Sequence, residues 1–209
     1  MSRVNARPGL NSGAGLLKAK HAERGSRVST TAALLRYGRG AIALHWLQAA
    51  LVLGMIGLGL YMAELPKGAE RSFVIGLHKS FGIVALVLVI FRLVWRKLHP
   101  APADPRLSPV ERRLAAAGHQ LLYLLLVAMP LAGYLSSSFT KYPMRVFGVV
   151  IPKAGWPDET INAFFNASHG FLAWALIGMI TLHLAAVALH SIKGKPVIGR
   201  MLPGRAPLN

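Results

Sequence analysis

Four long apolar segments constrain the fold of this chain more than any other feature of its sequence. They run near residues 41–62, 74–95, 114–136 and 167–190. Each has about the length that an α-helix needs to cross the hydrocarbon of a bilayer, roughly 20 residues. Of the 209 residues, 54% are hydrophobic and only 15% are charged. These features predict an all-α membrane protein, a four-helix transmembrane up-down bundle over residues 37–203.

The two ends of the chain lie outside this bundle. Residues 1–36 are basic and rich in Gly, Ser and Ala, a composition that is typical of disorder. We interpret them as a cytoplasmic tail that lies near anionic lipid. The alternative is an organellar targeting sequence, which is also rich in Arg and Ser and poor in acidic residues. Residues 204–209 form a short C-terminal tail.

The net charge of +17 is better explained by membrane topology than by nucleic acid, so no nucleic-acid partner is expected. Eighteen of the Lys and Arg residues lie in the two tails and around the connection between the second and third segments. The other six lie around the remaining two connections, at the opposite ends of the helices. By the positive-inside rule, both termini are cytoplasmic and the long loop 137–166 faces outward.

Histidine is the candidate metal ligand of this chain, which has no cysteine. The absence of cysteine excludes disulfides, cysteine-ligated iron–sulfur clusters and covalent c-type haem. His169 and His183 lie fourteen residues apart in the fourth segment. In an α-helix this spacing places them within about 40° of one face and about 21 Å apart along the axis.

Two further histidines lie at matching depths in an up-down bundle. His78, near the start of the second segment, is level with His169, and His45, near the start of the first, is level with His183. Two b-type haems, one above the other, need such facing pairs of imidazoles in an apolar pocket. The cationic residues Arg36, Arg39, Arg92 and Arg96 are candidate partners of haem propionates, although ordinary flanking charges would explain them as well.

Three alternative roles for these histidines are open but weaker. A single intramembrane histidine often makes a hydrogen bond between helices. Zinc is disfavoured because no Cys or carboxylate lies at the same depths. A proton relay is disfavoured because the four apolar segments contain no Asp or Glu. Four histidines at two matched depths therefore favour two haems.

Each segment also carries a motif that resembles one family. The four motifs are "ALHWLQA", "GLHKSFGI", "AAAGHQLLYLLLVAMPLAGY" and "SHGFLAWALIGMITLHLAAVALH", in that order along the chain. Together they resemble the prokaryotic cytochrome b561 family over roughly residues 37–203. The resemblance implies a di-haem protein of the bacterial inner membrane. It implies that His45 and His183 hold the inner haem and that His78 and His169 hold the outer one.

The resemblance also implies an activity. Members of the family pass electrons between a donor at the outer surface and the quinone pool. The stand-alone type implies an oxidoreductase that takes electrons from superoxide and reduces ubiquinone. The alternative is an electron-transfer subunit that is fed by a partner dehydrogenase or a soluble cytochrome. A haem-free membrane anchor or transporter is a third, weaker hypothesis.

Three further residues are candidates for these reactions. His119 and His190 are expected near the cytoplasmic surface, where an imidazole can donate a hydrogen bond to a quinone carbonyl and then supply a proton. Either of them is also an alternative ligand of the inner haem. Lys79 follows His78 directly and is expected to attract a small anion such as superoxide to the outer haem.

Overall fold

A computed structural model of the chain describes residues 20–21, 37–100, 104–195 and 197–202. The expectations for residues 1–36, apart from Lys20 and His21, and for residues 204–209 lie outside this described part. The prediction for Arg36 lies outside it as well.

Four long helices make up most of the described chain, as the apolar segments predict. They are α2 (Arg39–Glu64), α3 (Ala69–Leu98), α4 (Pro109–Ser138) and α5 (Glu159–Ile192). All four are long and apolar enough to cross a membrane. Each extends beyond its apolar segment, because polar residues at its ends continue the helix. Few side chains in the four spans are buried inside the protein, as expected for helices that face lipid.

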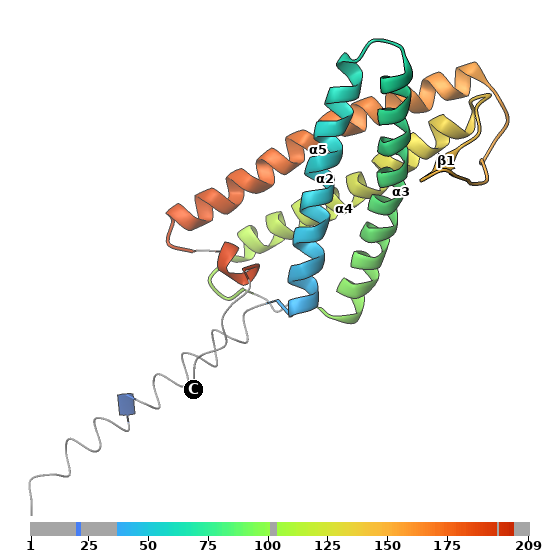
Figure 1. Ribbon diagram of the computed structural model, residues 1–209. Coiled ribbons are helices and arrows are strands. Elements are labelled where there is room, and N and C mark those ends of the chain that lie inside the picture. Colours follow the sequence, from blue (N-terminus) through green and yellow to red (C-terminus); the bar gives the residue numbers. More distant parts are fainter. Residues whose placement is uncertain (1–19, 22–36, 101–103, 196, 203–209) are drawn as a thin grey trace, which may run out of the picture. The chain divides into compact units, whose positions relative to one another are not determined.

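Successive helices run antiparallel, and the pair α2–α3 crosses the pair α4–α5 obliquely (Figure 1). α2 packs against α3, α4 packs against α5, and α3 contacts α4. Val52, Leu125 and Leu176, from α2, α4 and α5, form a buried cluster near the middle of the bundle. This cluster separates the two ends of the bundle. The tail end carries the start of α2 and the end of α5, and the hairpin end carries the loop between α4 and α5.

Local sequence signals explain where α4 and α5 begin. Pro109 occupies the first turn of α4, and Ser108 and Glu111 form a reciprocal capping box in front of it. Asp158 caps α5 by accepting a hydrogen bond from the backbone N–H of Ile161 at 2.9 Å. α5 therefore begins inside the long loop 137–166, before the fourth apolar segment.

The loop between α4 and α5 contains a short β-hairpin. Strands β1 (Arg145–Val146) and β2 (Val149–Val150) pair in antiparallel register. Phe147 and Gly148 join them with φ angles of 48° and 86°. Two consecutive positive φ values are typical of the tight turns that match the twist of paired strands.

At the tail end, the residues that follow α5 contact α2 and α4. A short helix η1 (Ile198–Arg200) follows α5, and Met201 accepts a hydrogen bond from the indole Nε1–H of Trp46 at 2.7 Å. The Lys195 ammonium lies 3.0 Å from the Glu111 carboxylate. These contacts tie the end of the chain to α2 and α4.

Candidate functional site

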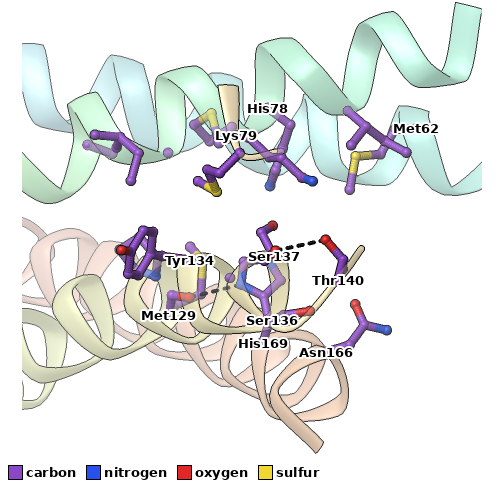
Figure 2. Close-up of a pocket in the computed structure, with 18 of the residues that line it drawn as sticks. Met62, His78, Lys79, Met129, Tyr134, Ser136, Ser137, Thr140, Asn166 and His169 are labelled. Atoms are coloured by element: carbon purple, nitrogen blue, oxygen red, sulfur yellow. Dashed lines mark hydrogen bonds between the residues drawn. The ribbon is translucent and has the colours of Figure 1, made fainter. Parts of the chain in front are cut away.

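Two histidines face each other at the hairpin end of the bundle. His78 of α3 and His169 of α5 have ring centroids 6.0 Å apart and ring planes at 85°. Both side chains are half-buried. The structure thus brings together the first pair that the sequence predicts (Figure 2).

The environment of this pair orients both rings. The Nδ1 of His169 lies 2.9 Å from the carbonyl oxygen of Met129 on α4. A carbonyl only accepts, so Nδ1 carries the proton and Nε2 keeps its lone pair for a ligand. A Cβ atom added to Gly133 would lie 3.0 Å from the His169 ring, and one added to Gly59 would lie 3.3 Å from the His78 ring. Glycine is thus the residue that leaves room for each imidazole.

A cavity of about 340 Å³ extends along these two histidines. Two cations, Arg71 and Lys79, line it, and no acidic residue does among the described residues. Figure 2 shows Lys79 beside His78 on α3, opposite His169. Uncharged polar side chains line the same cavity: Ser136, Ser137, Thr140, Asn162 and Asn166. The cavity therefore combines facing imidazoles with a positively charged, hydrogen-bonding wall.

Gln48 is a lining residue that the sequence analysis did not single out. Its side chain lies on α2, one turn beyond His45, and the residue is only 2% exposed. Neither atom of its amide has a hydrogen-bond partner among the described residues. Gln48 is the one amide side chain in the apolar segment 41–62. Because a buried polar group needs a partner, this residue could have been recognised from the sequence as a candidate site residue.

A second cluster of histidines lies at the tail end. The rings of His119 and His183 are 5.6 Å apart, with their planes at 67°. His45 is an electrostatic neighbour of both. Its Nδ1 lies 2.8 Å from a guanidinium nitrogen of Arg92. The structure therefore gathers three imidazoles here, and the ring that faces His183 directly is that of His119.

Two arginines flank this cluster. The guanidinium groups of Arg92 and Arg96 each lie 5.4 Å from the ring centroid of Tyr123. Within the described chain, neither arginine has a carboxylate partner. Two cations beside apolar helices and three imidazoles make a site that suits an anionic group.

Two other predicted site residues lie away from these clusters. Arg39 is exposed at the start of α2. His190 is half-buried near the end of α5, and its Nδ1 has no hydrogen-bond partner in the described part of the chain. Lys67 and Lys141 are exposed and do not line the cavity.

Comparison with known proteins decides the family. The family model described as prokaryotic cytochrome b561 matches residues 36–204. The chain belongs to this family.

Three relatives of the family share most of their length with this chain. Cytochrome b561 homolog 2 of Escherichia coli (strain K12) is 38% identical over 177 residues, which cover 80% of this chain and 91% of the relative. Probable superoxide oxidase CybB of Yersinia pestis is 31% identical over 173 residues, or 80% of this chain and 96% of the relative. Cytochrome b561 homolog 1 of Escherichia coli (strain K12) is 25% identical over 175 residues, or 81% and 98%.

Family membership makes this chain a multi-pass membrane protein of electron transfer, and it implies haem b. The histidine geometry fits that group. The facing rings of His78 and His169, 6.0 Å apart, and of His119 and His183, 5.6 Å apart, would supply the imidazole nitrogens that haem iron takes as ligands.

Proposed function

We propose that this chain is a superoxide:ubiquinone oxidoreductase with two b-type haems. Two superoxide anions are oxidised to dioxygen at the hairpin end, and one ubiquinone takes up the two electrons and two protons at the tail end. Haem b supplies one-electron carriers between the two ends. The observation that carries the proposal is the cavity in which Lys79 and Arg71 lie beside two facing imidazoles.

The histidines have distinct roles in this proposal. His78 and His169 would hold the haem at the hairpin end, because their rings face each other. His183 is one ligand at the tail end, with His45 as its partner. His119 is the competing partner, because its ring faces that of His183 directly. Arg92 donates a hydrogen bond to the Nδ1 of His45, so the proton of the neutral His45 ring lies on Nε2, which is then not available as a ligand.

The cations bind the charged groups of the reaction. Arg92 and Arg96 are suited to haem propionates at the tail end, since they have no carboxylate partner there in the described chain. Arg39 is a weaker candidate for the same role, because it is exposed. At the hairpin end, Lys79 attracts the superoxide anion and holds it near the His78 side of the cavity.

Quinone reduction is assigned to the tail end. His190 has a half-buried imidazole two helical turns beyond His183, and its Nδ1 has no hydrogen-bond partner among the described residues. Such a group can donate a hydrogen bond to a quinone carbonyl and then deliver a proton. The excess of Lys and Arg at this end supports a cytoplasmic location for it and an inner-membrane location for the protein.

An assay with the purified full chain tests this function. A reduced-minus-oxidised spectrum must first show a b-type band. Superoxide generated enzymatically should then reduce that band and drive formation of quinol from added ubiquinone, and superoxide dismutase should abolish both signals. A b-type band that superoxide does not reduce would favour the alternative, a subunit fed by a partner dehydrogenase or soluble cytochrome.

A further inference from the structure

The β-hairpin folds back along α3 instead of projecting from the bundle (Figure 1). The backbone N–H of Phe147, in the turn of the hairpin, donates to the hydroxyl of Ser80 at 2.9 Å. The rings of Phe147 and Phe81 are 5.3 Å apart, with their planes at 87°. The turn is therefore attached to the middle part of a membrane-spanning helix.

The position of Ser80 gives the depth of this attachment. α3 runs from Ala69 to Leu98, so its midpoint lies between Ile83 and Val84. Ser80 is three to four residues from that point, or about 5 Å along the axis. The hydrocarbon of a bilayer extends roughly 15 Å from its centre. With the midpoint of α3 placed at the bilayer centre, a hairpin turn bonded to Ser80 lies well inside the apolar layer.

The hairpin presents apolar side chains on its outside. Phe147, Val149 and Val150 are 56%, 67% and 55% exposed. In water, this exposure would be unfavourable, because three large apolar groups on six residues would remain hydrated. In contact with acyl chains, the same exposure stabilises the hairpin.

Several polar groups of the hairpin backbone have partners within the protein. Non-helical backbone inside a bilayer requires internal partners for its polar groups. Ser80 accepts from the N–H of Phe147, and the guanidinium of Arg145 donates to the carbonyl of Gly148 at 3.1 Å. Strand pairing joins Arg145 to Val150, and the N–H of Ile151 donates to the carbonyl of Met144 at 2.9 Å.

We propose that residues 145–150 form a re-entrant hairpin whose outer side contacts the acyl chains of the leaflet at the hairpin end. Met144, directly before β1, is buried and lines the cavity of His78 and His169. The hairpin thus has lipid on one side and a wall of the cavity at its base. It keeps acyl chains out of the cavity and leaves the polar wall around Lys79 as the route for an anion. The depth of the hairpin follows from the membrane span of α3 and from the contacts of Phe147 with Ser80 and Phe81, so it does not depend on the proposed function.

Spin labelling tests this depth directly, because the chain has no cysteine of its own. A nitroxide is attached to the full chain carrying Val149→Cys, in liposomes of phosphatidylcholine and phosphatidylglycerol. Collision with dissolved oxygen and with a water-soluble nickel chelate is measured by power saturation. Val87→Cys, at an exposed position near the middle of α3, is the lipid reference, and Lys67→Cys, in the turn between α2 and α3, is the water reference.

We expect the label at residue 149 to resemble the lipid reference, with high oxygen and low nickel collision. Nickel collision equal to that of the water reference would overturn the proposal. Low collision with both reagents would overturn it as well, because it would mean that protein covers the hairpin. Adding Ser80→Ala to the Val149→Cys variant should raise nickel collision several-fold, and unchanged collision would overturn the anchoring role of Ser80.

Discussion

His169 is the candidate ligand whose ring is contacted both by a backbone carbonyl and by a close-packed glycine. Its Nδ1 donates a hydrogen bond to the carbonyl of Met129, and a Cβ added to Gly133 would lie only 3.0 Å from the ring. Because His169 lines the cavity and Nδ1 is bonded to Met129, Nε2 is the ring nitrogen left for a ligand. A preorganised ligand reduces the ordering that binding requires, so small changes around this ring should be visible in the bound metal.

Gly133→Ala tests that packing. The new Cβ would lie 3.0 Å from the ring of His169, closer than nearly all such contacts, so the imidazole must tilt or shift by a few tenths of an ångström. We expect a shifted low-spin EPR signal for one haem. Gly170→Ala is the matched control, because it adds the same methyl group next to His169 in open space. Identical spectra for the two variants would contradict this account.

Removing the imidazole tests the ligand assignment. His169→Ala and His78→Ala should each lower the haem-to-polypeptide ratio by about half, because these two histidines would together hold one of the two proposed haems. The pyridine haemochrome of the purified protein measures this ratio. His99→Ala is the control, since His99 stacks on Trp95 at the end of α3, outside both clusters. A wild-type ratio in His169→Ala would refute the assignment, and the same measurement on His45→Ala and His119→Ala identifies the partner of His183.

At the scale of elements, the α3–α4 linker is joined to η1 through one buried carboxylate. Asp104 is 3% exposed. Its oxygens accept from the Arg106 guanidinium at 2.9 and 2.7 Å, and Arg200 of η1 lies 3.6 Å away. The hydrogen bonds from Arg106 lower the pKa of Asp104 to about 2. The charged form is thus the one that the folded protein stabilises.

Asp104→Asn should therefore destabilise the tail end in a pH-dependent manner. A pKa that is lower in the folded than in the unfolded state contributes stability above the unfolded value, near 4, and this contribution is lost as the pH falls toward 2. We expect a loss of about 2 kcal/mol at pH 7 and roughly half of that at pH 3. Denaturant unfolding of the protein in micelles measures both values.

Arg113→Gln is the control for this measurement. It removes one charge from an exposed position near the start of α4, at the same end of the bundle. Its effect on the free energy of unfolding should be small and should not follow the titration of Asp104. A pH-independent loss in Asp104→Asn would show that packing, rather than ionisation, is what the carboxylate contributes.

At the scale of the whole molecule, the charge at the hairpin end is expected to govern the rate of superoxide oxidation. Lys79→Glu reverses a cation on the cavity wall. We expect the rate with superoxide to fall several-fold at low ionic strength while the haem spectrum is retained. The difference should shrink at high salt, because the Debye length falls from about 10 Å at 0.1 M to about 3 Å at 1 M.

Lys67→Glu makes the same charge change in the turn between α2 and α3, away from the cavity. It should affect the rate less than Lys79→Glu does. Equal rates for wild type and both variants over the whole salt range would show that the charge of Lys79 does not attract superoxide to the cavity. They would also weaken superoxide as the donor.

The sequence by itself determined the four membrane spans, the family and the two levels of histidines. Span length and the spacing of His169 and His183 are properties of one helix, since rise and rotation per residue are constant along it. The depth match of His78 with His169 needs only the up-down order of the helices. The ring contact confirms that these two side chains meet.

Tertiary structure decided which groups share a cluster. His119 faces His183, Arg92 bonds to His45, and the amide of Gln48 is buried in the cavity wall. The hairpin turn at Phe147 reaches Ser80, 67 residues earlier in the chain. Each of these contacts depends on how neighbouring helices are rotated and crossed. That rotation is set by side-chain packing between helices, which the period of a single helix does not contain.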